Sequence, residues 1–354
     1  MTRDFEIKEY IESEDKLPLF LTGDSLSVLK SFPSNSIDCI ITSPPYWGQR
    51  DYSNGGIGLE DTPEMFISNL LEIIKELYRV VKPTGSFWLN IGDTYGNKSL
   101  QGIPWRVAIK MMDEQKWILR NSVIWNKHKG GLHSSKDRLR NVHENFFHFV
   151  KKAKGYYYDA NSIRTKPREA SVKNGSVVSA TGVTGIRYKR QIELSTSLSE
   201  IEKVNALSQL NKVLERISQG EISDFRMIIR NQQRTTHSDS ANVSGRAKEL
   251  NEKGFYFLMY NPNGTLPCDV WDIIPEDTQK REKHFAAFPE DLCRIPIMAT
   301  CPIDGIVLDP FCGTGTTSKV AIHFNRKSIG IDLSQEYIEL AQNRIGIYEL
   351  NETL

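Results

Sequence analysis

The stretch GIVLDPFCGTGTT, residues 305–317, passes from a short apolar run through two glycines into a helical pattern. Residues 305–309 predict a buried strand, and residues 316–324 predict the helix that follows it. Gly313 and Gly315 allow a tight turn and the close approach of a ligand to the backbone. The first N–H groups of a helix favour a carboxylate or a phosphate, and open α/β sheets bind ligands at the carboxyl ends of their strands. The stretch therefore predicts a strand, a ligand-binding loop and a helix.

An acid at the end of the next predicted strand narrows the class of ligand. Residues 328–332 predict that strand, and Asp332 stands about twenty residues beyond the loop, where an acid can bind ribose hydroxyls. The loop lacks the third glycine of a dinucleotide fingerprint and the Gly-Lys pair of a phosphate-binding loop. A structural glycine turn is the alternative for the loop taken alone. Together these features point away from NAD and ATP, and toward a cofactor without a pyrophosphate.

Apolar patterns on both sides of this stretch predict an open, mostly parallel α/β sheet. They show helical spacing in some segments and short buried runs in others. The further predicted strands are residues 19–23, 36–42, 86–91, 117–125 and 145–150, and the further predicted helices are residues 63–81, 104–114, 288–299 and 334–345.

The regular pattern stops near residue 161 and returns near residue 266. Between these points, residues 171–184 are rich in Ser, Gly, Val and Thr, residues 199–217 predict one amphipathic helix, and residues 232–245 are polar. The central stretch therefore predicts an insertion. The expected divisions are residues 17–160, 161–265 and 266–345.

The stretch TSPPYW, residues 42–47, directly follows the second predicted strand. Its two prolines end the strand and stiffen the loop. They fix the Ser43 hydroxyl and the Pro44 carbonyl, and both can accept hydrogen bonds from an amino group. Tyr46 offers an aromatic face on which an extruded base can stack. The alternative is a strand-ending turn with a buried aromatic ring.

The composition is that of an ordinary globular chain. The 354 residues are 39% hydrophobic and 25% charged, which fits one large α/β domain with an insertion, or two modest domains. No apolar run approaches the length of a transmembrane helix, and the polar N-terminus is unlike a signal peptide. The five cysteines form no CxxC pair. No metal site is therefore expected, and reduced thiols fit a cytoplasmic protein.

Basic residues are concentrated in one part of the chain. The net charge is +1, but residues 120–190 contain sixteen Lys or Arg against four Asp or Glu. Such a stretch can hold nucleic-acid phosphates, and a solvated surface is the simpler alternative. Arg can also pair with guanine, and Gln with adenine. The predicted DNA contacts are Trp47, Lys127, Arg138, Arg140, Arg187, Arg190, Arg230, Gln232, Gln233 and Arg234.

The pair TSPPYW (residues 42–47) and DPFCGTGTT (residues 309–317) resembles the motifs of amino-methylating DNA methyltransferases of restriction–modification systems. The first motif precedes the second here, which matches the permuted, β-type arrangement of that family. The resemblance covers residues 17–160 and 266–345, including FAAFPEDL at residues 285–292. It implies a circularly permuted, Rossmann-like α/β sheet that binds S-adenosylmethionine, with a target recognition domain in the central stretch.

The resemblance also implies roles for single residues. Ser43, Pro44, Pro45 and Tyr46 would form the catalytic loop. Asp332 would bind the ribose of the cofactor, and Asp24 its adenine amino group. The residues that would surround its methionine part and sulfonium are Asp309, Phe311, Gly313, Gly315 and Thr316.

The implied reaction is methylation of an exocyclic amino nitrogen in duplex DNA, with the target base flipped out. Methylation of a ring carbon is not expected, because the chain has no Pro-Cys-Gln motif and its nearest approach, Pro267-Cys268-Asp269, precedes the glycine loop. In the family, serine at the first catalytic position favours cytosine N4 and aspartate favours adenine N6. Both side chains can accept the hydrogen bond. Cytosine N4 is therefore expected, with adenine N6 as the alternative.

Two further alternatives are an RNA methyltransferase and a non-catalytic DNA-binding module. The expected partner is double-stranded DNA. A cognate restriction endonuclease would act on the same site without needing to bind this chain, which would be a monomer or a homodimer.

Overall fold

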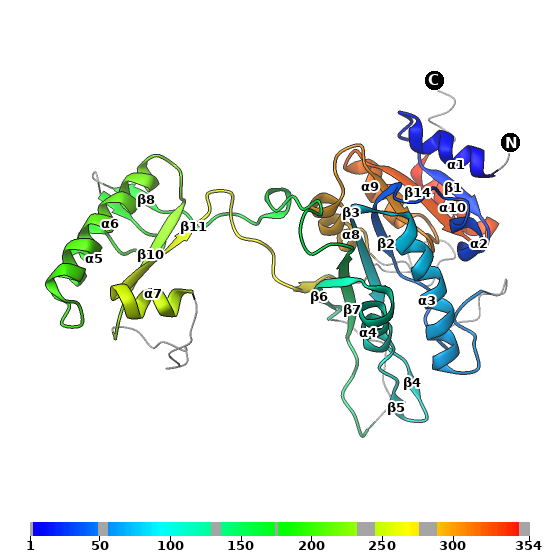
Figure 1. Ribbon diagram of the computed structural model, residues 1–354, viewed down its shortest axis with the longest axis horizontal. Helices are drawn as coiled ribbons and strands as arrows, with labels where there is room; N and C mark the ends of the chain where they lie inside the picture. Colours follow the sequence, from blue (N-terminus) through cyan, green and yellow to red (C-terminus); the bar gives the residue numbers. More distant parts are fainter. Residues whose placement is uncertain are drawn as a thin grey trace. The chain divides into compact units, whose positions relative to one another are not determined.

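Figure 1 shows the computed structural model, which describes residues 3–48, 56–128, 136–173, 176–231, 245–275 and 289–346. The chain forms two compact units, one combining Met1–Ser162 with Cys268–Leu354 and the other comprising Ile163–Pro267. Within the described ranges, no helix has the length and apolar character needed to cross a membrane. The larger unit carries both sequence motifs.

In the described part of the larger unit, eight strands form one sheet. Strand β7 runs antiparallel to β3 and β6, and the other neighbours are parallel. The order across the sheet is β1 (Leu19–Thr22), β14 (Lys327–Asp332), β13 (Ile306–Asp309), β2 (Ile37–Thr42), β3 (Val81–Ile91), β7 (His143–Val150), β6 (Ile118–Asn126) and β12 (Val270–Asp272). The predicted mostly parallel α/β sheet is confirmed.

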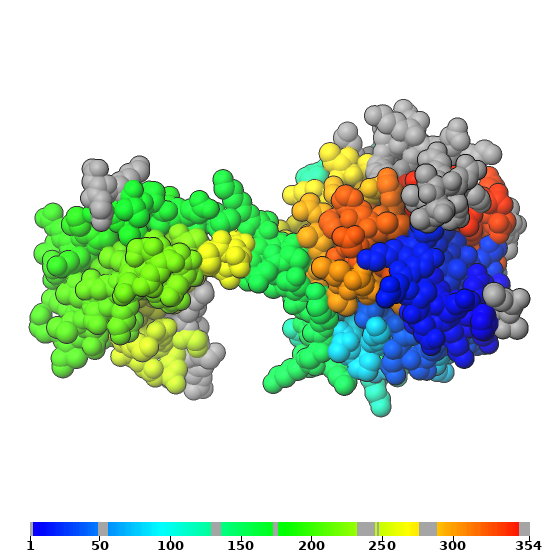
Figure 2. Space-filling view, turned by 90° about the horizontal axis from the view of Figure 1, so that it is seen from above, coloured from blue at the N-terminus to red at the C-terminus, as the bar shows by residue number. Residues whose placement is uncertain are grey.

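Strands from the two ends of the chain are interleaved in this sheet. The late strand β13 lies between the late strand β14 and the early strand β2, and β1 pairs with β14. In Figures 1 and 2, the first (blue) and last (orange and red) segments of this unit accordingly lie side by side. Such interleaving is what a circular permutation of an open sheet produces.

The sheet is covered on both faces. Every residue of β2 is buried, and because side chains alternate along a strand, its neighbours Ile40 and Ile41 enter different hydrophobic clusters. One cluster includes side chains of α1 (Arg3–Glu12), α2 (Ser25–Leu29), α3 (Pro63–Val80) and α4 (Ile103–Gln115). The other includes side chains of α8 (Glu290–Thr300) and α9 (Thr316–His323). The last helix, α10 (Gln335–Ile345), follows β14.

This unit differs from the sequence prediction in several parts, among them α2 and β12, which were not predicted. Strand β3 begins at Val81 rather than at residue 86, because Val81 pairs with Ile37 ahead of a bulge. Helix α1 was not predicted. Distant contacts hold it, since Tyr10 Oη donates to the Ser328 carbonyl at 3.0 Å and Lys327 Nζ donates to the carbonyls of Tyr10 and Ser13 at 2.5 and 2.6 Å.

The smaller unit has its own hydrophobic core. Its elements are β8 (Ser171–Lys173), β9 (Ser176–Val178), α5 (Gly185–Glu193), α6 (Glu200–Ser218), β10 (Asp224–Ile229), α7 (Arg246–Lys253) and β11 (Phe255–Tyr260). Strands β10 and β11 pair antiparallel, and α5 and α6 pack with them around Tyr188, Leu210 and Phe225. The predicted helix at residues 199–217 is confirmed as α6, which begins with a capping box formed by Ser199 and Glu202.

Candidate active site

The SPPY loop, residues 43–46, begins at the carboxyl end of β2. Ser43 Oγ lies 3.2 Å from Tyr46 Oη, and Asn90 Nδ2 donates to Tyr46 Oη at 2.8 Å and more weakly to Ser43 Oγ at 3.3 Å. Gly92 permits this arrangement, because a Cβ there would lie 2.7 Å from Cε2 of the Tyr46 ring. The loop side chains are therefore held by the end of the neighbouring strand β3.

A carboxylate that the sequence did not single out completes this network. Tyr46 Oη donates to Glu144 Oε2 at 2.7 Å, and Asn90 Nδ2 donates to the same oxygen at 2.9 Å. The other oxygen of Glu144 accepts from Lys127 Nζ, which also lies 4.5 Å from the centre of the Trp125 ring. Glu144 stands in β7, beside β3. Only the antiparallel pairing of these strands could have revealed its position.

The glycine loop, residues 310–315, joins β13 to α9. Gly313 and Gly315 have φ angles of 50° and 72°, the left-handed region that favours glycine. A Cβ on Gly315 would lie 2.9 Å from Ala341 Cβ. The hydroxyl of Thr314 in this loop is buried without a partner among the described residues. Tight backbone and a free buried hydroxyl suit a loop that encloses a small ligand.

Asp309 ties the SPPY loop to the glycine loop. Its carboxylate is buried and accepts from Thr42 Oγ1 at 2.7 Å, Thr317 Oγ1 at 2.6 Å and the Phe311 backbone N–H at 3.1 Å. Burial raises the pKa of Asp309 to about 6, although these hydrogen bonds act in the opposite direction. Thr42 directly precedes Ser43, so Asp309 connects the ends of β2 and β13.

Two more predicted acids lie at the same edge of the sheet. Asp332 ends β14, and its two oxygens accept the N–H groups of Gly313 and Ser334, each at 2.9 Å. Burial raises the pKa of Asp332 above its ordinary value. Asp24 follows β1 and caps α2 through Ser27 N–H at 2.9 Å. A carboxylate offers about four lone-pair directions, so Asp332 keeps acceptor capacity for hydroxyls.

An ion-pair cluster fixes the start of α9. Arg344 Nη1 donates to Thr316 Oγ1 at 2.8 Å, and Arg344 Nη2 donates to Glu290 at 2.7 Å. Lys319 also donates to Glu290, at 2.9 Å. Burial raises the pKa of the Glu290 carboxyl, but the two cations outweigh it and the pKa lies below its ordinary value. Thr316 is therefore held by Arg344 of α10, which is in turn paired with Glu290 of α8.

Nine of the ten predicted DNA contacts fall into three groups. Arg140 is exposed, and so are Arg187 and Arg190 on α5. The contacts of Lys127 are given above, Trp47 Nε1 donates to the Glu60 carbonyl at 2.8 Å, and Arg138 lies 3.4 Å from the centre of the Tyr95 ring. Gln232, Gln233 and Arg234 lie outside the described residues, as do residues 285–288 of the FAAFPEDL stretch.

Arg230 is taken up by contacts within the smaller unit. Its guanidinium contacts both oxygens of Glu202 at 3.0 Å, the Ser197 carbonyl at 2.9 Å and the Asn251 carbonyl at 3.1 Å. These contacts join α6 to the segment after β10. A structural role explains Arg230 without DNA.

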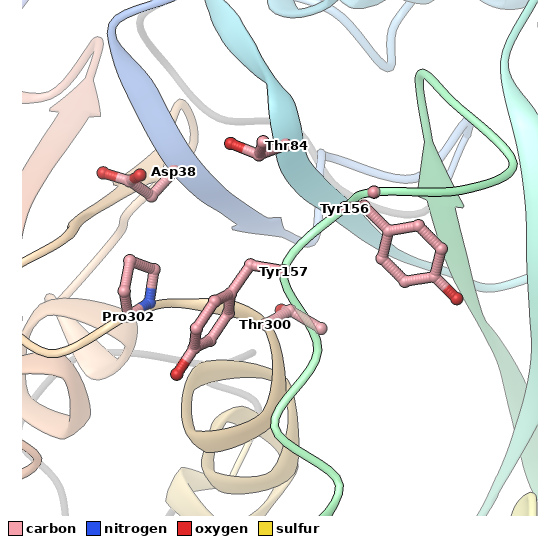
Figure 3. A pocket seen from close by; sticks show the side chains of 7 residues that line it. Asp38, Thr84, Tyr156, Tyr157, Thr300 and Pro302 are labelled. Carbon is pink, nitrogen blue, oxygen red and sulfur yellow. The ribbon is translucent and has the colours of Figure 1, made fainter.

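A cavity of about 300 Å³ lies near the amino ends of β2 and β3, away from both loops (Figure 3). Its one carboxylate, Asp38, is already paired, because it accepts from Lys82 Nζ at 2.8 Å and from the Ile306 N–H at 3.0 Å. None of the predicted site residues lines this cavity, whose lining is Asp38, Thr84, Gly155, Tyr156, Tyr157, Thr300 and Pro302. Open α/β sheets bind ligands at the opposite, carboxyl edge, where both loops lie.

Comparison with known proteins agrees with this geometry. The N6_N4_Mtase family model, described as DNA methylase, matches residues 37–343. The Type II methyltransferase M.SfiI of Streptomyces fimbriatus is 29% identical over 89% of this chain and 88% of its own. The PvuII DNA methyltransferase (cytosine-N4-specific) superposes with a TM-score of 0.53 at 18% identity, covering 92% of this chain and 85% of that one. TTHA0409 of Thermus thermophilus, solved with S-adenosyl-L-methionine bound, gives a TM-score of 0.50 at 18% identity, over 94% of both chains.

The two solved structures share the fold, and the family model spans both motifs, the insertion and every strand of the sheet except β1. The fold class, the resemblance and the S-adenosylmethionine cofactor expected from the sequence are thereby confirmed. The chain belongs to the N6/N4 DNA methylase family, and its fold is that of S-adenosylmethionine-dependent DNA methyltransferases.

Proposed function

We propose that this chain methylates the N4 amino group of cytosine at a specific site in duplex DNA. The observation that carries the proposal is the bond of 2.7 Å between Thr42 and Asp309. This bond supports the proposal because Ser43, which would accept a hydrogen bond from the amino group, directly follows Thr42, beside the loop that would hold the methyl donor. S-adenosylmethionine supplies a methyl group on a positively charged sulfur. The residues of the glycine loop and its neighbouring acids fit this group, since they offer backbone N–H groups and carboxylates for a nucleoside.

The chemistry asked of the SPPY loop is the activation of a weak nucleophile. The lone pair of an exocyclic amino nitrogen is delocalised into the base. When the Ser43 hydroxyl and the Pro44 carbonyl accept hydrogen bonds from its two N–H groups, the nitrogen can become pyramidal and attack the methyl group in line. The sulfur would keep the electron pair of the broken bond to the methyl group, and the methylated nitrogen would then lose one proton to water. Alignment supplies most of the rate, and the two acceptors stabilise the positive charge that grows on nitrogen. Tyr46 would stack on the extruded base.

Ser43 supports cytosine rather than adenine. The structural relative with the cytosine-N4-specific description has the same fold, and the family as a whole includes both chemistries. Adenine N6 is therefore the second candidate. A serine and an aspartate can both accept the same hydrogen bond, so the base must be identified chemically.

The decisive experiment is to incubate the chain with radiolabelled S-adenosylmethionine and genomic DNA, digest the DNA to nucleosides and identify the labelled one by mass spectrometry. N4-methylcytosine is expected. N6-methyladenine would replace the proposal by the second candidate. A parallel reaction should contain RNA in place of DNA. If label entered the RNA but not the DNA, the proposal that DNA is the substrate would be wrong.

We further propose that the smaller unit recognises the target sequence. Helix α5 supports this, because Arg187, Lys189 and Arg190 are all exposed on it. Loss of a base contact relaxes preference at one position by about 1–3 kcal/mol, whereas loss of a phosphate contact weakens all sequences alike and lowers the salt slope. Alanine variants of these residues can be tested on a library of sites, with Lys212→Ala on α6 for comparison. If no α5 variant changed affinity or preference, the helix would be excluded from recognition.

A further inference from the structure

We infer that Glu144 is a positioning residue that makes Ser43 a hydrogen-bond acceptor toward the target amino group. It would do so by fixing the direction of every O–H bond between itself and Ser43. The inference rests on the proposed function, because it concerns the same SPPY loop. It adds a residue of β7 to the contacts that hold the SPPY loop, which follows β2 and is otherwise contacted by Asn90 of β3.

The geometry is a short chain of hydrogen bonds. Ser43 Oγ lies 3.2 Å from Tyr46 Oη, and Tyr46 Oη lies 2.7 Å from Glu144 Oε2. Asn90 Nδ2 reaches both ends of the second bond, at 2.8 and 2.9 Å. The side chain of Glu144 is 12% exposed, so bulk water has little access to it.

The chemistry of the groups sets the direction of these bonds. An ionised carboxylate can only accept, and a phenol has one O–H. The Tyr46 hydroxyl must therefore donate its one hydrogen bond to Glu144. Its oxygen then presents only lone pairs to Ser43. Ser43 then donates its single proton to Tyr46. One lone pair of Ser43 faces Asn90 Nδ2 at 3.3 Å, and the other remains available to accept a hydrogen bond from the base.

Because of Lys127, a neutral amide at position 144 could not replace the charged carboxylate of Glu144. Its ammonium group contacts the oxygen of Glu144 that Tyr46 does not use, and an ammonium group can only donate. If Glu144 were an amide, Lys127 would draw the amide oxygen toward itself. The amide NH₂ would then face Tyr46, which would have to turn its O–H toward Ser43. Ser43 would present its own O–H to the amino group, and the required hydrogen bond would be lost.

This reasoning gives a test in which one substitution repairs another. Glu144→Gln should lower the single-turnover methylation rate on the order of tenfold to a hundredfold, the scale for misplacing one transition-state hydrogen bond. Lys127→Met in the E144Q background should restore most of that rate, because the amide can then turn its oxygen to Tyr46 and Asn90. A role in packing alone predicts that the second substitution adds damage.

The measurements use the full chain with saturating duplex DNA and S-adenosylmethionine, so that weaker DNA binding by K127M does not affect the rate. Glu114→Gln, which alters an exposed Lys–Glu pair on α4, is the matched control. In a Tyr46→Phe background, Glu144→Gln should have no further effect on the rate, because the hydrogen bonds that link Glu144 to Ser43 are already missing. An unchanged rate in E144Q, or no recovery on adding K127M, would overturn the inference. If the wild-type chain methylated no amino group, the proposed function itself would fail.

Discussion

The SPPY loop and the glycine loop lie at the same edge of the sheet but are held in different ways. Side chains from other strands hold the first, since Asn90 comes from β3 and Glu144 from β7. The glycine loop is held through its backbone N–H groups instead, since β14 accepts the Gly313 N–H at the Asp332 carboxylate and the Cys312 N–H at the Ile331 carbonyl, each at 2.9 Å. The difference suggests a division of labour, in which one loop orients a base and the other encloses a nucleoside.

The largest expected effect is on chemistry alone. Ser43→Ala removes an acceptor that acts mainly in the transition state, so turnover should fall on the order of a hundredfold or more. The dissociation constant for S-adenosylmethionine should stay near the wild-type value. Single-turnover kinetics and calorimetry would measure the two quantities. An equal loss of cofactor binding would show that the two loops do not act separately.

The converse substitution, in the cofactor site, should weaken the binding of S-adenosylmethionine without affecting the methyl-transfer step. Asp332→Ala removes a half-buried carboxylate that can accept ribose hydroxyls, and should weaken S-adenosylmethionine binding by about 1.5–3 kcal/mol, the scale of a hydrogen bond to a charged group. Calorimetry would measure this, with Asp113→Ala, an exposed residue of α4, as the control. Unchanged affinity in the Asp332 variant would place the ribose elsewhere.

The same contrast explains what the sequence could predict. The strand, loop and helix around residues 305–324 are encoded locally, by an apolar run, two glycines and a helical pattern, and the structure contains all three. Glu144 is encoded by nothing nearby. Its place depends on the pairing of β3 with β7, which brings together residues far apart in the chain. Arg230 is a second case, because its charge predicted a DNA contact, whereas its described partners lie in its own unit.

A smaller effect tests whether the backbone of the glycine loop must be tight. Gly315→Ala should destabilise the larger unit by about 1–2 kcal/mol from the left-handed backbone alone, and more if Ala341 at 2.9 Å cannot move. Gly102→Ala is the matched control, because Gly102 has a φ of 69° and no atom lies within 4 Å of the position that a Cβ would take there. Equal losses in the two variants would mean that the contact with Ala341 contributes nothing.

The smallest effect concerns the bond that joins the two loops. Thr42→Val removes one hydrogen bond to Asp309 and keeps the shape of a side chain that is 1% exposed. All six tryptophans lie in the larger unit, so their fluorescence during urea unfolding reports the stability of that unit. A hydrogen bond to a charged acceptor is worth about 1.5–3 kcal/mol and one to a neutral acceptor about 0.5–1.5. The loss in free energy of unfolding on Thr42→Val should therefore be about 1 kcal/mol larger when Asp309 is charged than when it is neutral.

The direction of that pH dependence follows from the pKa of Asp309, which burial raises from 3.8 to about 6. The folded state holds this proton more tightly than the unfolded state, so the contribution of Asp309 to stability is greatest at low pH and is lost as the pH rises through about 6. Removing a donor to the charged form raises the pKa further. The stability deficit of T42V relative to wild type should thus widen from pH 5 to pH 8. Thr22→Val removes a bond to the neutral Gln335 amide at the end of β1, and its deficit should stay constant. A constant deficit in T42V as well would mean that the charge of Asp309 does not couple the two loops.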